Sequence, residues 1–139
     1  VGFMQDSTEA DFEKFWLEEI ATCDSENGLF LAIAGDQVLG SVIITRELRA
    51  NGRHRAELRK LLVHSKAQKM GIGTALERLA TNYAKEIGLN LLYLDSATTY
   101  LIDGVYEKWG WKKSGEIPNF AKNPDGTLVS TWFFYKLLS

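Results

Sequence analysis

Cysteine is almost absent from this chain, and its absence narrows what the protein can be. Cys23 is the single cysteine among 139 residues, so we expect neither an internal disulfide nor a zinc site built from several cysteines. No apolar run approaches the roughly 20 residues that a membrane-spanning helix needs. No signal-peptide pattern opens the chain either. The prediction is therefore a cytoplasmic protein without a metal cofactor or a membrane partner.

A large excess of charge of either sign is also lacking. The formal net charge is −2 at pH 7, which argues against nucleic acid as the main partner. The composition is ordinary for a globular protein, and the length suits one domain with its own core. The chain opens on 1–4 (VGFM) without an initiator methionine, as the interior of a protein would. We therefore expect a single domain spanning 1–139 from which an N-terminal piece is missing.

Hydrophobic periodicity predicts three helices and six strands. The expected helices cover 6–21, 71–87 and 100–108. The expected strands cover 29–34, 38–45, 55–63, 90–95, 111–115 and 128–138. Because a strand–helix–strand unit stands at the centre of this order, two central strands should be parallel. The pattern predicts an α/β (α+β) fold.

A glycine-containing loop lies between a predicted strand and a long predicted helix. A helix N-terminus has unpaired N–H groups and a positive dipole, and glycine lets a ligand approach the backbone closely. The loop therefore favours an anion such as a phosphate, although a plain strand-to-helix turn would have the same sequence. Leu76 stands where a dinucleotide fingerprint needs its third glycine, and no lysine follows Gly73 as a P-loop requires. The candidate ligand-binding residues are Gln68, Lys69, Met70, Gly71, Ile72, Gly73 and Thr74.

Together with two later segments, this loop resembles the GNAT superfamily of N-acetyltransferases. The strand at 91–95 and the segment 105–111 (VYEKWGW) follow it in the family's order. The resemblance implies a mixed sheet with splayed central parallel strands flanked by helices, and acetyl-CoA as co-substrate. On this resemblance, we expect the first strand and helix of the family to be missing here. We therefore expect an open sheet edge, filled either by upstream residues of a longer natural chain or by a second copy in a homodimer.

Within the superfamily, the chain is most similar to tabtoxin-resistance acetyltransferases. The similar stretches are 1–4, 55–58, 94–95, 115–118 and 124–126. The resemblance implies that the partner is a small-molecule amine, such as an amino-acid-like toxin or antibiotic. Family acceptor sites are built from variable loops, here expected at 48–54, 100–104 and 118–122. The sequence itself does not identify the acceptor.

The chemistry needs a base, because an amine with a pKa of about 10 is protonated at neutral pH. Glu57 and Asp95 are the candidates, and the resemblance implies that both face the acceptor. It also places Tyr106 as the general acid for the leaving thiolate. Each residue has a structural alternative: a solvated strand acid, a turn cap and a core tyrosine. The resemblance further implies that cofactor contacts come from Leu61, Leu62, Val63 and Thr99.

Other functions remain open at this point. The chain could be a protein or peptide N-acetyltransferase, or a non-catalytic domain that binds acyl-CoA. An acyl-enzyme route is disfavoured because Cys23 lacks a basic neighbour and neither His54 nor His64 forms a triad with a nucleophile. We therefore expect direct transfer from acetyl-CoA to the amine.

Overall fold

The computed structural model describes residues 26–67, 71–98 and 104–138. Some sequence predictions lie outside these residues: the helix at 6–21, the loop residues Gln68, Lys69 and Met70, Thr99, the start of the helix at 100–108 and most of the acceptor loop at 100–104. The remaining predicted elements are all present. The strand at 55–63 has the predicted ends, and the others have shifted ends. The largest shift is in the strand expected at 111–115, which runs over Lys112–Lys122.

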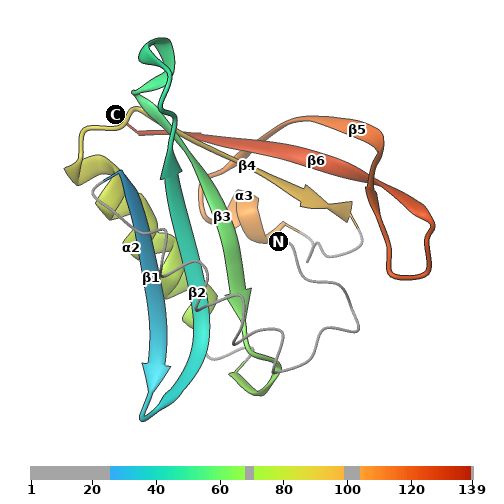
Figure 1. Cartoon of the computed structure of the whole chain (residues 1–139), viewed down its shortest axis with the longest axis horizontal. Coiled ribbons are helices and arrows are strands. Elements are labelled where there is room, and N and C mark those ends of the chain that lie inside the picture. The colour runs from blue at the N-terminus through green and yellow to red at the C-terminus, as the bar shows by residue number, and fades with distance from the viewer. Residues whose placement is uncertain (1–25, 68–70, 99–103, 139) are drawn as a thin grey trace.

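Six strands form one mixed sheet in the order β1-β2-β3-β4-β6-β5 (Figure 1). The strands are β1 (Asn27–Ala34), β2 (Gln37–Arg46), β3 (Arg55–Val63), β4 (Leu91–Ala97), β5 (Lys112–Lys122) and β6 (Leu128–Leu137). The helices are α2 (Ile72–Glu86) and α3 (Val105–Lys108), with short 3₁₀ turns at η1 (Ala50–Gly52) and η2 (Ser65–Ala67). β3 and β4 are parallel and every other described pair is antiparallel. The predicted mixed fold is confirmed.

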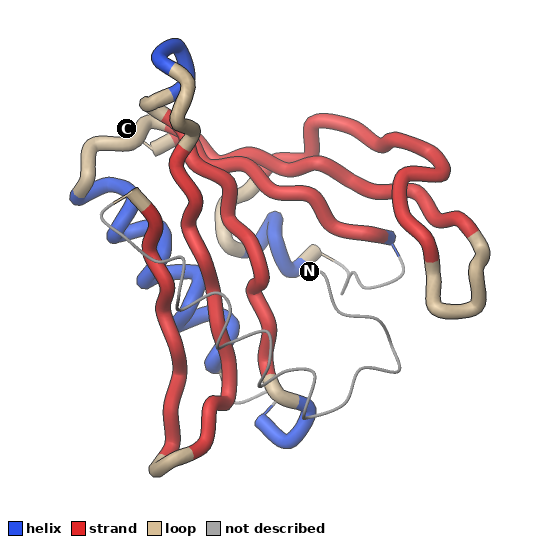
Figure 2. Tube along the Cα trace, in the orientation of Figure 1, coloured by secondary structure: helices blue, strands red, loops and turns tan. Residues whose placement is uncertain are grey.

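The two parallel strands part soon after they meet. Their pairing runs from Arg55 opposite Leu91 to Glu57 opposite Tyr93, although β3 continues to Val63 and β4 to Ala97. Figure 2 shows the two strands diverging from this point. The expected splay of the central strands is therefore confirmed.

A β-bulge that the sequence did not reveal accompanies the splay. Ser41 of β2 faces Leu62 whereas Ile43 faces Arg59, so β3 carries one more residue than β2 between these pairs. Lys60 within the bulge has φ 54°, and its carbonyl accepts a hydrogen bond of 2.5 Å from the Ser41 hydroxyl. Because a bulge bends its strand and increases the local twist, it helps to direct β3 away from β4.

The core lies on the face of the sheet that α2 and α3 cover. Leu76, Ala80 and Ala84 form the buried stripe of α2, at the four-residue spacing of one helix face. They belong to one cluster with strand residues and with α3. Its other buried members are Val42, Ile44, Ala56, Leu58, Leu89, Leu92, Leu94, Tyr106, Trp111, Phe134 and Leu138.

The first turns of α2 rest directly on Gly40 of β2. A Cβ atom at Gly40 would lie 2.9 Å from the Leu62 carbonyl oxygen and 3.0 Å from side-chain carbons of both Ile72 and Leu76. Such separations are too short for ordinary packing, so only glycine lets the helix approach the sheet this closely.

We predict that Gly40→Ala destabilises the fold by about 1–3 kcal/mol, the usual cost of overpacking a core. Urea denaturation followed by circular dichroism measures the change. Gly115→Ala is the matched control, because a Cβ on that β5 residue would meet no atom within 4 Å. Equal stability of Gly40→Ala and the unmodified protein would contradict this packing of α2.

Candidate functional site

Among the described residues, the opening between β3 and β4 leaves one backbone edge of β3 without a strand partner. Leu61, Leu62 and Val63, all expected to bind the cofactor, lie in this second half of β3. Leu62 and Val63 pair with β2 on the other edge only. Backbone N–H and C=O groups on such an edge need hydrogen-bond partners, and a ligand that carries amides could supply them.

The described part of the glycine turn begins at Gly71, directly before α2. Gly71 is the N-cap residue, with φ 80° and no side-chain cap, and Ile72, Gly73 and Thr74 follow it in the helix. The first N–H groups of a helix have no partner within it. A Cβ at Gly73 would meet Trp109 and Val63 only at ordinary contact distance, so Gly71 is the glycine that the backbone conformation requires.

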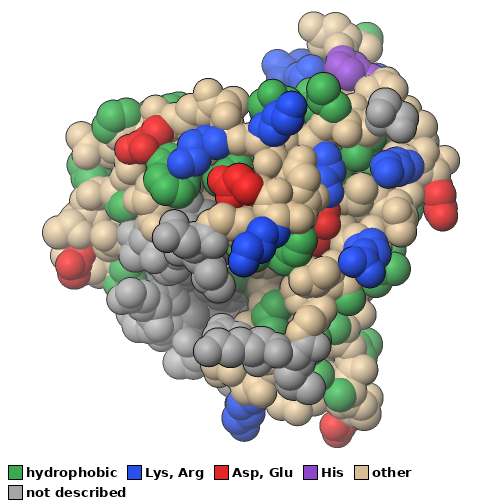
Figure 3. Space-filling model, turned by 180° about the vertical axis from the view of Figure 1, so that it is seen from behind, with side chains coloured by type: hydrophobic (Ala, Val, Ile, Leu, Met, Phe, Trp, Pro, Cys, Tyr) green, Lys and Arg blue, Asp and Glu red, His purple; other side chains and the backbone are tan. Residues whose placement is uncertain are grey.

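A polar groove of about 320 Å³ lies between α2, the end of α3 and Lys136 of β6. Its walls include Thr74, where the hydroxyl accepts a 3.3 Å hydrogen bond from the Trp109 indole. Arg78, Lys85 and Lys108 also line it, and none of the three forms an ion pair with another described residue. Figure 3, seen from the α2 side, shows Lys and Arg side chains gathered on this face. The groove is therefore suited to an anion.

Sequence reasoning missed this basic groove, although a signal was present. Thr74, Arg78, Thr81 and Lys85 recur at the spacing of one helix face, opposite the apolar stripe. The fourth cation of the groove, Lys136, comes from β6. Its ammonium lies 2.5 Å from a carboxylate oxygen of the buried Glu77, so that charge is already paired.

Glu57 and Asp95 lie on the face of the sheet opposite to α2. The residues next to them in sequence, such as Leu58 on β3 and Leu94 on β4, are buried in the core on the α2 side. Because Glu57 is registered with Tyr93, which lies two residues before Asp95, both carboxyl groups project from the same face. The structure brings the two predicted acids together.

The environment of Glu57 favours its protonated form. Burial is the main cause that raises the pKa of its carboxyl group, and the negative charge of Asp95 raises it further. The positive charges of Arg59 and Lys60 partly oppose both effects. A carboxylate that holds a proton more tightly is a better base near neutral pH.

Tyr106 approaches from the other side of the sheet, on α3. It is 8% exposed, and its ring centroid lies 5.1 Å from that of Phe134 and 5.8 Å from that of Trp109. Burial raises the pKa of the Tyr106 phenol, a hydrogen bond with Ser96 lowers it, and the charge of Asp95 raises it again. The phenol therefore stays protonated at neutral pH. Tyr106 is a core residue and also a possible proton donor, and Ser96 is a partner that the sequence did not reveal.

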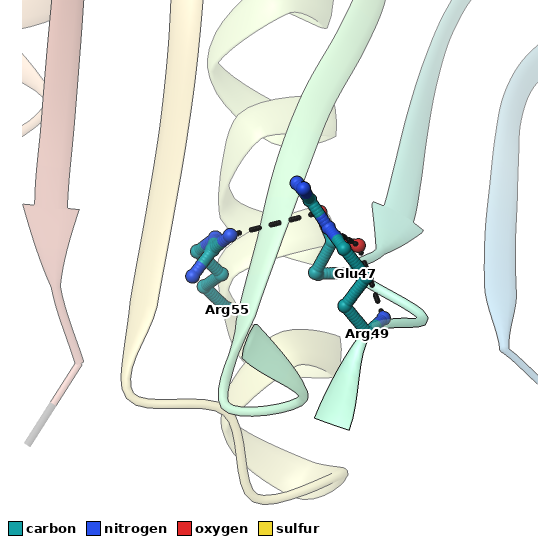
Figure 4. A network of polar contacts seen from close by, with 3 residues as sticks. All are labelled: Glu47, Arg49 and Arg55. Carbon is teal, nitrogen blue, oxygen red and sulfur yellow. Dashed lines mark hydrogen bonds and ion pairs between the residues drawn. The ribbon is translucent and has the colours of Figure 1, made fainter. Parts of the chain in front are cut away.

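A network of charged side chains orders the connection that leads into β3 (Figure 4). Arg49 donates two 3.1 Å hydrogen bonds to the Glu47 carboxylate, and a guanidinium nitrogen of Arg55 lies 3.6 Å from it. The hydrogen bonds of Arg49 come first among the causes that lower the pKa of Glu47 to about 2. Gly52 is packed beneath, where a Cβ would lie 2.5 Å from Glu47. This connection belongs to the predicted acceptor region at 48–54.

In the described ranges 26–67, 71–98 and 104–138, no helix has the length and apolar character needed to cross a bilayer. In the same ranges no three His, Cys, Asp or Glu side chains come together as a metal site would require.

The raised pKa of Glu57 has a consequence for stability. Between its ordinary value near 4.5 and its raised folded value, the folded state binds more protons, so stability falls as pH rises through that window. We predict that Glu57→Gln melts at a higher temperature than the unmodified protein at pH 7–8. The difference should disappear below about pH 4. Differential scanning calorimetry across pH measures it.

Glu116 provides a control of opposite sign, because hydrogen bonds from Trp132 and then from Ser130 lower the pKa of its carboxyl group. Glu116→Gln should gain no stability at neutral pH. A Glu57→Gln variant that melts no higher than the unmodified protein at pH 7 would show that the Glu57 carboxylate is not strained by its surroundings.

The fold recurs among solved acetyltransferase structures. A GNAT-family acetyltransferase from Streptococcus pneumoniae is 24% identical with a TM-score of 0.76, over 96% of this chain and 79% of that one. A ribosomal-protein-alanine N-acetyltransferase from Brucella melitensis is 20% identical with a TM-score of 0.75, over 94% and 80%. A Bacillus subtilis acetyltransferase solved in complex with CoA is 18% identical with a TM-score of 0.68, over 94% and 85%. At identities this low, the structural similarity establishes the shared fold alone.

The family itself is established by sequence. Residues 3–111 match the profile of the acetyltransferase (GNAT) family, which is well over half of the chain. The matched region includes the glycine turn, both carboxylates, Tyr106 and the strand edge described above. The chain therefore belongs to the acetyltransferase (GNAT) family and is an acyltransferase.

Proposed function

We propose that this acyltransferase moves an acetyl group from acetyl-CoA directly to the amine of a small molecule. The observation that carries the proposal is the opening between β3 and β4, with Glu57 and Asp95 on one face and Tyr106 on the other. An acceptor and a thioester meeting in this opening would have a base on one side and an acid on the other. The tabtoxin-resistance group remains the model for the acceptor, as a small amino-acid-like amine.

The described residues fit acetyl-CoA, which supplies the activated acetyl group when it binds. The open edge of β3 at 61–63 matches the amides of the pantetheine arm and can donate an N–H to the thioester oxygen. The turn at Gly71 and the first N–H groups of α2 match the pyrophosphate. Arg78 and Lys108 in the adjoining groove suit the remaining phosphate.

The protein's own groups would then manage the protons. Glu57, with its raised pKa, accepts the proton that the ammonium form of the substrate must lose. The negative charge of Asp95 raises the pKa of Glu57 and attracts a cationic substrate. Tyr106, held by Ser96 and its aromatic neighbours, donates to the leaving thiolate.

A protein or peptide acceptor is the second candidate. It is favoured by the shared fold with the protein from Brucella melitensis that is named for acetylating a ribosomal-protein alanine. Peptides that begin with alanine, tested beside small amines, separate the two candidates. A non-catalytic acyl-CoA-binding domain is disfavoured, because Glu57, Asp95 and Tyr106 are all present.

Acetyl-CoA should stabilise the protein, since a ligand that binds only the native state raises its stability by about 2.7 kcal/mol at 100 times Kd. We predict a rise in melting temperature that Gly71→Asp abolishes, because that change puts a negative charge where a phosphate would lie. A thermal-shift titration with acetyl-CoA measures both effects.

Gly35→Asp is the matched control for Gly71→Asp. Gly35 also has a positive φ, 63°, and open space around its missing Cβ, but it lies in the β1–β2 turn. It should tolerate aspartate with similar backbone strain and keep the acetyl-CoA response. If millimolar acetyl-CoA produced no shift in the folded, unmodified protein, the proposed cofactor would be wrong.

The proposed roles also predict separate kinetic effects. Tyr106→Phe keeps the ring but loses the hydroxyl, so kcat should fall while acetyl-CoA affinity stays nearly unchanged. Glu57→Gln and Asp95→Asn should lower the rate at neutral pH by about 10²–10⁴-fold if the altered residue is the base. The deficit should shrink at higher pH, where the amine loses its proton unaided. Thiol release across pH 6–10 measures these rates.

The two carboxamide variants also decide which residue is the base. If the rate falls strongly in one variant and only slightly in the other, the residue altered in the first variant is the base. Unmodified rates and pH profiles in both variants would mean that neither carboxylate accepts the proton, and that ordered water or the substrate carries it instead.

A further inference from the structure

Aromatic side chains lie beside the two carboxylates on the same face of the sheet. Phe133 of β6 is registered directly opposite Asp95, so their side chains share one face. Phe120 of β5 packs against Phe133, with ring centroids 5.3 Å apart and planes at 86°. We call Phe120 and Phe133 the aromatic wall. Its first member, Phe133, is the direct neighbour of the carboxylate residue Asp95 across the two strands.

The wall depends on an irregularity in the β5–β6 hairpin. Ile117 faces Thr131 and Ala121 faces Val129, so β5 carries two more residues than β6 in this stretch. Asn119 within it has φ 57°, a left-handed conformation that asparagine accepts more readily than most residues. Bulges of this kind often redirect side chains next to functional sites, and here the next residue is Phe120.

Phe120 remains 52% exposed although it is large and apolar. An exposed phenylalanine whose ring neighbour faces Asp95 offers a surface for a flat apolar group. The predicted acceptor region at 118–122 includes this residue. Neither member of the wall takes part in a hydrogen bond or ion pair through its side chain, so its contribution to binding would come from ring contacts alone.

We infer that the aromatic wall binds the carbon skeleton of the acceptor, and that the acceptor is a primary amine on a short chain ending in an aromatic ring. This inference rests on the proposed function. Its cationic amine would lie at Glu57 and Asp95, which attract positive charge, and its ring would pack against Phe120 and Phe133. The charge of the acids and the apolar character of the wall together match the two ends of one arylalkylamine.

The test compares 2-phenylethylamine with n-butylamine as acceptors for the whole chain, with acetyl-CoA saturating. The expected result is a kcat/KM at least about 10-fold higher for 2-phenylethylamine, the size of effect that a favourable aromatic contact produces. The difference should come from a lower KM for 2-phenylethylamine, with similar kcat for the two amines. Equal kcat/KM values for the two amines, or preferred acetylation of peptides that begin with alanine, would overturn the inference.

Phe120→Ala is the main variant, because an exposed edge residue can be truncated without emptying the core. It should raise KM for 2-phenylethylamine about 10-fold and leave n-butylamine and acetyl-CoA unaffected. Phe133→Leu should act in the same direction. Ile33→Ala is the matched control, since Ile33 is 60% exposed at the far end of β1. A Phe120→Ala variant whose KM rises equally for both amines, or for neither, would count against the aromatic wall.

Calorimetric titration of 2-phenylethylamine, with CoA present, separates this inference from the proposed function. Binding that Phe120→Ala weakens, in a protein that releases no thiol with any amine, would support the wall and reject the transferase mechanism. Turnover of simple amines without a preference for the aromatic one would support the mechanism and reject the wall. Absence of both binding and turnover would reject both.

Discussion

Three residue pairs join β3 to β4, and the place where this pairing stops sets the position of both proposed carboxylates and of the open strand edge. β4 stays bound to β6 as far as Ala97, so it cannot follow β3. The extra residue at Lys60 adds a bulge to β3, and a bulge bends its strand. The strands therefore separate at the level of Glu57 and Asp95, and the rest of β3 keeps a backbone edge that a ligand can use. A fully paired sheet would offer neither feature.

Helix α2 holds the two sides of this opening at a set distance. It rests on β2 through Gly40, and it is tied to β6 by the pair between Glu77 and Lys136. Both members of that pair are largely buried. Removing one would leave the other as an unpaired buried charge, and the loss in stability would exceed what the pair itself contributes. Because the glycine turn at Gly71 is the start of the same helix, these contacts also position the proposed phosphate site relative to the strand edge.

The electrostatics of the site favour proton transfer at some cost in stability. The pKa of Glu57 is raised by burial and by Asp95, and that of Tyr106 by burial. Glu47 and Glu116, which accept hydrogen bonds near the surface, have lowered pKa values instead. Groups whose charged forms are disfavoured by their surroundings are typical of functional sites. The contrast separates carboxylates that support the structure from the one suited to act as a base.

The sequence alone predicted the order of the described elements and the glycine turn, because these follow from local periodicity and from short motifs. It proposed Glu57, Asp95 and Tyr106 as site residues through the resemblance to the GNAT superfamily. It also predicted parallel central strands, since one strand–helix–strand unit requires them. Only the tertiary structure decided that Tyr106 lies on one side of the sheet and both carboxylates on the other, and that Phe120 meets Phe133. Strand register and bulges decide these placements. Both depend on contacts between strands far apart in the chain, and a shift of one residue would move each side chain to the other face.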